Sequence, residues 1–386
     1  MAGNQFRPPG CSGYSHYMGA SKNLATLHDY LEDTLRSDIE TMYNNGVPLF
    51  TKDMLSQISR QLEEYDQALL GDNKIRLKNM KGEEVEFTLC SDEPSGWFEW
   101  RCNAGDKRTK PFIFYCSIQR LLSQGQGDMF PFDPQKTCLA VGPVCPKLRK
   151  DGGASEEVDP PKLMFHVPTL TRLFELTRQD WETSNVFPEI RTLLKANRNR
   201  LYKVDNIVAF ALGQLSDGNN FESDCAYQHA FVLSIQRILS EMTTPKPFYY
   251  FKPLLKALSK NKKDHDVELY AQDPAYTDSD KEVLADAGIK VLPDPKGFLQ
   301  VGDNSMVVSI SANIPIHQII ADIARPAAII WDEHETAMDG PEAHSSADPW
   351  SPRVEKMLND EYMYVMFKLP FADKLRHLAL YIRKDL

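Results

Sequence analysis

Between residues 204 and 332, short apolar runs alternate with stretches of helical periodicity. The runs end at residues 212, 271, 292, 310 and 331. The first of them, Ile207 to Leu212, is continuously apolar, which is typical of strands that are buried on both faces of a sheet. Alternation of strands and helices with short connections favours right-handed crossovers and a parallel sheet. The central part of the chain is therefore predicted to be α/β, with a doubly wound, mostly parallel sheet.

The rest of the chain divides by composition and periodicity. Residues 1–20 are rich in Gly, Pro and Ser and are expected to be a mobile tail. Residues 21–161 are expected to form an N-terminal α+β domain with a linker, and residues 162–335 the sheet domain. Residues 336–386 are expected to form a loop with C-terminal helices.

Within the N-terminal domain, helices are expected from Ser21 to Asn45 and from Thr51 to Leu70. Polar and apolar residues alternate over 74–78 and 84–88, and a turn at Lys81-Gly82 separates the two segments, which predicts a β-hairpin. Residues 97–122 predict a strand and a short helix, and the Gly- and Pro-containing stretch 123–161 is interpreted as loop or linker.

In the sheet domain, Ser279 and Glu282 have the spacing of a capping box for a helix that stops at Gly288. Beyond the sheet, apolar spacing predicts two C-terminal helices, at about 353–365 and 371–384.

Bulk composition narrows the class of protein. No apolar run approaches the ~18 residues needed to span a bilayer, and Arg7-Pro8-Pro9-Gly10 stands where a signal peptide would be apolar. The seven cysteines are scattered without a CxxC pair, which favours reduced thiols. A net charge of −10 disfavours indiscriminate nucleic-acid binding. We expect a cytoplasmic protein with no membrane partner.

Polar residues come after the predicted strands at positions that a parallel sheet brings to one edge. Ligands of open α/β sheets bind beyond the carboxyl ends of the strands. The candidates for substrate binding there are Gly213, Asp273 and Asn313, and the candidates for catalysis are Ser311 and the acidic turn after residue 331.

That acidic turn contains Asp332, Glu333 and Glu335 beside His334. Two carboxylates that face one cavity could act as general acid and base; a solvated acidic turn is the alternative. Ser311 is either a nucleophile or, together with Asn313, a candidate cap for the helix near Pro315, and capping is the favoured interpretation.

Several cofactor and metal motifs are missing from the sequence. Gly213 and Gly218 lack GxGxxG spacing, no Gly-Lys-Ser/Thr occurs for a phosphate loop, and no GxSxG elbow is present. The histidines, among them His229 and His317, show no HxH or HExxH spacing. We therefore expect no cofactor and no metal, and Gly213 could simply permit a tight turn.

One local patch departs from the acidic composition. Lys252, Lys256, Lys260 and Lys263 lie in a stretch without an acidic residue from Met242 to Lys263. The first three recur at four-residue steps, which predicts one basic ridge. This ridge is either a solvated face or a contact for an RNA phosphate backbone. Further basic residues could extend the ridge, namely Arg191, Lys195, Arg198, Arg200 and Lys203.

Motifs between Val204 and Asp332 resemble the Sensitivity to Red Light Reduced family. They include Leu212-Gly213, the segment Tyr227 to Phe231, the segment Ala271 to Thr277, Ala287 to Leu292, and Pro326 to Trp331. The resemblance implies a Rossmann-like sheet. Plant and animal members have a Pro-His step where this chain has Ile314-Pro315-Ile316-His317.

The N-terminal domain and the Trp331-Asp332 ending are similar to the fungal branch of that family, part of which resembles arginine-containing cyclodipeptide synthases of secondary metabolism. That likeness implies arginyl-tRNA and a second aminoacyl-tRNA as substrates. It makes Glu222 and Asp224 candidates for binding the arginine guanidinium. The alternatives are a non-enzymatic regulatory member of the family and a small-molecule transferase with a nucleotide-like cofactor.

Overall fold

The structure of the protein is a computed structural model. It describes residues 33–67, 69, 71–89, 100–102, 111–123, 138–144, 146–148, 165–217, 220–243, 267–333, 347–366, 375 and 378–386. The chain divides into two compact units, Met1–Val47 and Pro48–Leu386. In the first unit a helix over residues 33–44 ends at Asn45-Gly46, as predicted. The mobile tail expected over residues 1–20 lies outside the described residues.

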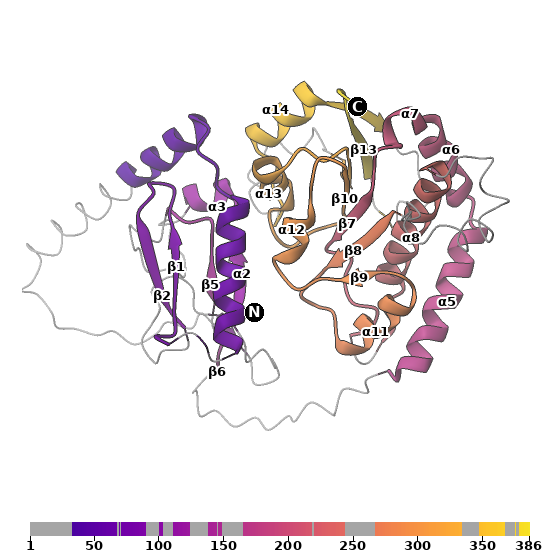
Figure 1. Ribbon diagram of the computed structural model, residues 1–386, viewed down its shortest axis with the longest axis horizontal. Coiled ribbons are helices and arrows are strands. Elements are labelled where there is room, and N and C mark those ends of the chain that lie inside the picture. The colour runs from indigo at the N-terminus through magenta and orange to yellow at the C-terminus, as the bar shows by residue number, and fades with distance from the viewer. Residues whose placement is uncertain are drawn as a thin grey trace, which may run out of the picture. The chain divides into compact units, whose positions relative to one another are not determined.

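A mixed sheet with five parallel strands organises the second unit (Figure 1). The parallel strands are β7 (Asn206–Phe210), β8 (Glu268–Gln272), β9 (Lys290–Val291), β10 (Ser305–Ser309) and β11 (Ala328–Asp332). Their spatial order is β11-β10-β7-β8-β9. The chain therefore runs from β7 through β8 to β9 on one side, then crosses back to β10 on the other side of β7 and continues to β11. This confirms the doubly wound, mostly parallel sheet, and its switch point lies between β7 and β10.

The C-terminal part differs from its prediction. α14 (Pro352–Glu361) is the first of the two expected helices, but it is followed by β12 (Tyr362–Met366) and β13 (Leu378–Arg383), which extend the sheet antiparallel beside β11. The helix predicted over 371–384 is therefore wrong for residues 378–383. Their apolar run is buried almost throughout, which is the pattern of an interior strand rather than of an amphipathic helix.

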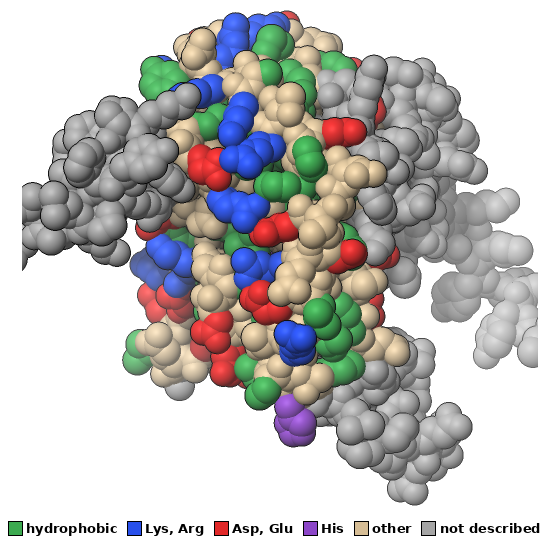
Figure 2. All heavy atoms as spheres, turned by 90° about the vertical axis from the view of Figure 1, so that its right-hand side faces the viewer, with side chains coloured by type: hydrophobic (Ala, Val, Ile, Leu, Met, Phe, Trp, Pro, Cys, Tyr) green, Lys and Arg blue, Asp and Glu red, His purple; other side chains and the backbone are tan. Residues whose placement is uncertain are grey.

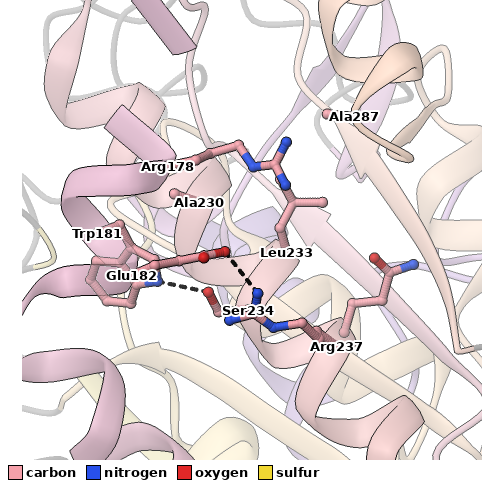
Figure 3. Close-up of a pocket in the computed structure, with 9 residues that line it drawn as sticks. Arg178, Trp181, Glu182, Ala230, Leu233, Ser234, Arg237 and Ala287 are labelled. Atoms are coloured by element: carbon pink, nitrogen blue, oxygen red, sulfur yellow. Dashed lines mark hydrogen bonds and ion pairs between the residues drawn. The ribbon is translucent and has the colours of Figure 1, made fainter. Parts of the chain in front are cut away.

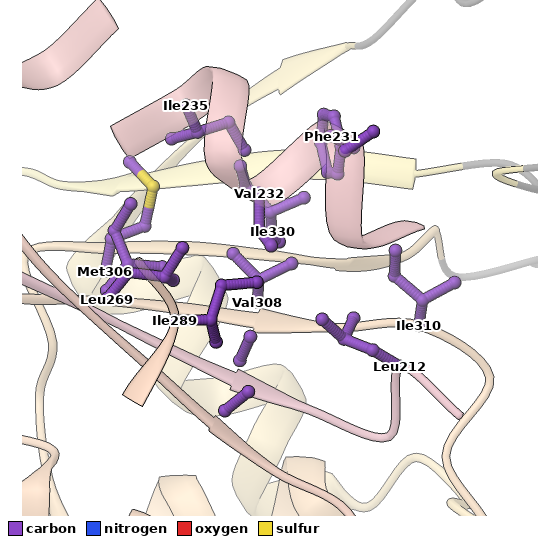
Figure 4. Close-up of a cluster of buried hydrophobic side chains, with 14 of the residues drawn as sticks. Leu212, Phe231, Val232, Ile235, Leu269, Ile289, Met306, Val308, Ile310 and Ile330 are labelled. Atoms are coloured by element: carbon purple, nitrogen blue, oxygen red, sulfur yellow. The ribbon is translucent and has the colours of Figure 1, made fainter. Parts of the chain in front are cut away.

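Helices cover both faces of the sheet. One face carries α5 (Val167–Thr183), α6 (Val186–Ala196) and α8 (Ser223–Thr243), and the other carries α12 (Lys296–Gln300) and α13 (Ile316–Ile323) (Figure 1). Under α8, Phe231, Val232 and Ile235 meet strand residues such as Val308 and Ile330 (Figure 4). Burying a large apolar side chain contributes ~1.5–3 kcal/mol, so this interface fixes α8 and the loop before it.

α11 (Asp278–Asp286) has its N-cap two residues before the predicted Ser279. Thr277 is the N-cap, and its hydroxyl accepts from the Asp280 amide while the Asp280 carboxylate accepts from the Thr277 amide. The Ser279–Glu282 capping box is therefore wrong. Asp280 also accepts from the Leu215 amide at 3.1 Å, so the true cap ties α11 to the loop after β7.

The N-terminal α+β part contains α2 (Lys52–Asp66), the hairpin β1 (Lys74–Lys78) and β2 (Glu84–Thr88), and α3 (Ile118–Ser123). Helix, hairpin and short helix agree with their predictions. Further strands are β3 (Trp100–Cys102), β4 (Phe112–Tyr115), β5 (Val141–Val144) and β6 (Pro146–Leu148). β5 and β6 occupy part of the stretch expected to be loop, because β4 and β3 supply partners that local sequence does not reveal.

Buried polar contacts hold this part against the helices of the sheet domain. The Asp322 carboxylate at the end of α13 accepts from the amides of Leu49 and Phe50, at 2.7 and 3.1 Å. The Gln318 side chain accepts from the Ile118 amide at 3.0 Å. Tyr115 donates to Asp294, beyond β9, at 2.6 Å.

Candidate functional site

Left-handed backbone occurs on both sides of the switch point. Ala211 (φ 57°) and Gly213 (φ 71°) come after β7, and Ser311 (φ 54°) comes after β10. The two strands are neighbours, with Ser309 opposite Phe210, so the turns lie next to each other. A left-handed residue with a side chain costs ~1–2 kcal/mol, and such strain is concentrated at functional sites.

Two aspartates hold these turns from the flanking strands. Asp332, at the end of β11, accepts from the Ser311 amide at 2.8 Å. Asp273, after β8, accepts from the amides of Gly213 and Ala275, each at 2.8 Å. Burial raises the pKa of Asp273, while these backbone hydrogen bonds act in the opposite direction. The predicted site residues Gly213, Asp273, Ser311 and Asp332 are thus brought to one edge of the sheet.

The Ser311 hydroxyl is not used as a helix cap. The N-cap of α13 is Pro315, without a side-chain hydrogen bond, and Asn313 is exposed. The capping role favoured for Ser311 and Asn313 is therefore wrong. The Ser311 Oγ is buried and has no hydrogen-bond partner among the residues that the structure describes. An unpaired buried hydroxyl costs about 1–3 kcal/mol, so it is an unusual group to retain for packing alone.

Glu222, just before α8, and Asp224, in its first turn, add negative charge to this edge. The pKa of the Cys225 thiol is raised to about 11. Burial is the largest cause, and the negative charges of Glu222, Asp273 and Asp224 are the next. A Cβ on Gly213 would overlap the Cys225 sulfur. Glycine is therefore required at Gly213 both by its positive φ and by the contact with α8.

Glu333 faces away from Asp332, as strand alternation predicts. Its carboxylate accepts from the Tyr364 hydroxyl of β12. The pKa of Tyr364 is raised to about 12, mainly by burial and next by this hydrogen bond. Glu335 and His334 lie outside the described residues.

Sequence reasoning missed a buried pair behind the site. His317 Nδ1 lies 3.2 Å from the Asp348 carboxylate, which also accepts from the His317 amide at 3.1 Å. The imidazole is enclosed by Trp331 and Trp350, at centroid distances of 4.4 and 5.4 Å. Burial opposes protonation of His317, but the Asp348 and Asp332 carboxylates outweigh it and raise the pKa. The partners are 31 residues apart, so no local motif could have revealed the pair.

His229 has a structural role. It is fully buried in α8, where Nδ1 lies 2.7 Å from the Cys225 carbonyl and must donate to it, and Nε2 lies 2.8 Å from the Tyr276 hydroxyl. Burial lowers the pKa of His229 to about 4, so the ring is neutral and links α8 to the loop after β8.

The predicted RNA-binding residues Lys252, Lys256, Lys260 and Lys263 lie outside the described residues. The described chain on either side, which ends at Thr243 of α8 and resumes at Val267 before β8, lies at the amino edge of the sheet. The candidate site lies at the carboxyl edge.

A surface pocket of about 150 Å³ lies away from this edge, between α5, α8 and the end of α11 (Figure 3). Arg237 pairs with Glu182 across it at 2.8 Å, and Trp181 donates to Ser234 at 2.7 Å. Its polar groups are therefore already occupied.

Among the described residues, no helix combines the length and apolarity needed to cross a membrane. The same residues contain no group of three His, Cys, Asp or Glu side chains that could hold a metal ion.

Comparison with known proteins identifies one domain. Residues 190–381 match the family model described as the SRR1 domain, a range that includes β7 to β11, both turns of the switch point, and His317 with Asp348. No curated protein and no solved structure matches the chain.

Proposed function

We propose that this chain, which belongs to the SRR1 domain family through residues 190–381, is an aminoacyl-tRNA-dependent cyclodipeptide synthase that forms a cyclo-arginine-Xaa diketopiperazine. The observation that carries the proposal is the acidic character of the switch point. Asp332 and Asp273 hold its two turns, and Glu222 and Asp224 stand at the start of α8.

This charge favours a cationic substrate. In dinucleotide-binding folds the first strand-to-helix turn receives a pyrophosphate at the helix N-terminus. Here that position carries Glu222 and Asp224 beside Asp273, and carboxylates at such a place repel phosphate. A guanidinium instead forms charge-assisted, often bidentate, hydrogen bonds with carboxylates. The same charges disfavour the alternative of a transferase with a nucleotide-like cofactor.

The proposed reaction consists of two aminolyses of activated esters. The amine of one aminoacyl group attacks the ester carbonyl of the other, an amide bond forms, and one tRNA leaves as its terminal alcohol. The free amine of the resulting dipeptidyl ester then attacks the remaining ester, which closes the ring and releases the second tRNA. Each attacking amine loses one proton and each leaving alkoxide gains one, so a general base and a general acid suffice.

The described residues supply groups for these steps. Asp332 takes the proton from the attacking amine, and Glu222 and Asp224 bind the guanidinium. Asp273 holds the Gly213 turn through Oδ2, while its Oδ1 accepts from the Ala275 amide of its own loop. Ser311 presents a buried hydroxyl beside Asp332, where it can hydrogen-bond a reacting group.

Mass spectrometry of extracts from an expressing host tests the proposal. The wild-type chain should yield a new arginine-containing diketopiperazine, and an equally abundant, folded Asp332→Asn chain should yield far less. A soluble wild-type protein that produces none would favour the non-enzymatic regulatory alternative.

A further inference from the structure

A second charged region lies at the opposite edge of the sheet. It comprises α6 with α7 (Arg198–Leu201) and the residues after them, and we call it the α6–α7 surface. Glu189 lies in the first turn of α6, and no further acidic residue occurs from 190 to 204. Figure 2 shows Lys and Arg side chains gathered on the face that carries α5 to α8, and acidic side chains become frequent toward its lower part. The basic members are Arg191, Lys195, Arg198, Arg200 and Lys203.

Three of these cations form no ion pair with a carboxylate among the described residues. Arg198 instead donates to the Met242 carbonyl at 2.8 Å, and Arg200 to the Lys384 carbonyl at 3.3 Å. Lys203 lies over the Tyr202 ring at 5.8 Å. The guanidinium groups are thus oriented by backbone carbonyls and keep their charge.

Arginines elsewhere on this face differ. On α5, Arg178 pairs with Glu175 at 2.8 Å, and on α8, Arg237 pairs with Glu182 at the same distance. Their charge is compensated locally, which is the ordinary condition of a solvated helix face.

The carboxylates near the α6–α7 surface do not balance it. Glu241 is shared by Arg191 at 2.9 Å and Lys195 at 3.7 Å. Asp385 pairs with Arg383 at 2.6 Å, and the attraction of Lys203 comes last among the causes that lower the pKa of Asp385. The five cations thus face Glu189 of α6, Glu241 and the Arg383-paired Asp385. A net positive charge remains on a chain whose total charge is −10.

An exposed aromatic ring lies in the same place. Tyr202 is 52 % exposed and stands between Arg200 and Lys203 in sequence. Basic side chains that track a phosphate backbone, combined with an aromatic ring on which a base stacks, are the usual elements of single-stranded nucleic-acid binding.

We propose that the α6–α7 surface binds RNA, through Arg198, Arg200 and Lys203 on the phosphate backbone and Tyr202 on an unpaired base. The identity of that RNA rests on the proposed function. It is the body of an aminoacyl-tRNA whose acceptor end reaches the candidate site at the carboxyl edge of the sheet. A five-residue strand spans about 17 Å, a distance that a tRNA exceeds. The surface also adjoins Met242, after which the chain carries six lysines and no acidic residue as far as Lys263.

Binding of purified full-length chain to tRNA tests the surface. The variant is Arg200→Gln with Lys203→Gln, and Tyr202→Ala is examined separately. The matched control, Lys74→Gln with Lys356→Gln, removes the same charge from exposed, carboxylate-paired lysines on β1 and α14. Anisotropy of labelled tRNA is measured between 50 and 300 mM salt, and vesicles of phosphatidylserine and phosphatidylcholine provide a second anionic probe.

The surface variant should weaken tRNA binding by about tenfold or more at 100 mM salt. It should also reduce the slope of log K against log salt by about 1.4–1.8, since two phosphate contacts are lost. The control should change neither, and Tyr202→Ala should weaken binding without changing the slope. Unchanged tRNA binding by the surface variant, no binding by the wild type, or stronger binding to vesicles than to tRNA would overturn the proposal. A wild type that binds tRNA through this surface but makes no diketopiperazine refutes the synthase and leaves the surface intact.

Discussion

Replacing Ser311 with glycine is expected to stabilise the fold and impair synthesis at the same time. Two costs are relieved: the left-handed φ of 54°, at about 1–2 kcal/mol, and the buried hydroxyl without a described partner, at about 1–3 kcal/mol. The added chain entropy of glycine offsets about 0.5–1 kcal/mol. The net expected gain is about 1–4.5 kcal/mol.

Two further variants separate these contributions. Ser311→Ala removes the hydroxyl but keeps the strained backbone, and it should stabilise by about 1–3 kcal/mol. Ala211→Gly relieves only backbone strain, at φ 57° on the other side of the switch point, and should gain up to about 1.5 kcal/mol. Both Ser311 variants should lose synthesis, whereas Ala211→Gly should retain most of it.

Urea unfolding is the assay, with midpoints compared at an unchanged m-value, and diketopiperazine formation is measured on the same preparations. If Ser311→Ala and Ser311→Gly unfold at lower urea than the wild type, the hydroxyl stabilises the native state. The inference that it is retained for chemistry would then be refuted.

The remaining predictions concern the pH dependence of stability, the glycine turn and cofactors. Burial raises the pKa of Asp294 from 3.8 to about 7, so the folded chain retains a proton that the unfolded chain releases, and this contribution to stability is lost as pH rises from about 4 through 7. Asp294→Asn keeps an acceptor for Tyr115 and Gln272. It should therefore stabilise the chain at pH 8.5 by up to about 4 kcal/mol and have little effect on stability at pH 4. Equal effects at the two pH values would contradict the assignment. Gly213→Ala should cost about 2 kcal/mol or more, from its positive φ and the overlap with Cys225, and Cys225→Ala should recover part of the loss in thermal melts. ATP, NAD and S-adenosylmethionine at millimolar concentration should not shift the melting temperature; a ligand at a hundred times its Kd would add about 2.7 kcal/mol, and such a shift would revive the transferase alternative.

The parallel sheet was predictable because each of its strands is encoded locally. An apolar run such as Ile207 to Leu212 ends at a polar or glycine residue, and a helical stretch of suitable length comes after it. The position of the site could be inferred from the same pattern, since parallel strands bring their carboxyl ends to one edge. Asp332 and Asp273 could therefore be placed near the turns that they hold.

The features that were missed depend on tertiary partners. β5 contains Gly142 and Pro143, which oppose strand formation locally, and it forms because β4 lies opposite. The run from Leu378 to Ile382 fits helical spacing in part, but burial between β11 and β12 makes it a strand. Asp348 meets His317 across 31 residues, and the burial of the Ser311 hydroxyl depends on the folded turn.

Synthesis by purified components tests the central claim most directly. The wild-type chain, given arginyl-tRNA labelled in the arginine together with a mixture of aminoacyl-tRNAs, should release a labelled diketopiperazine without ATP, NAD or added metal. Asp332→Asn, in which the amide oxygen can still accept from the Ser311 amide, should bind tRNA normally and react about a hundredfold more slowly, whereas Glu333→Gln should remain nearly as active as the wild type. Equal activity of Asp332→Asn and the wild type would contradict the account.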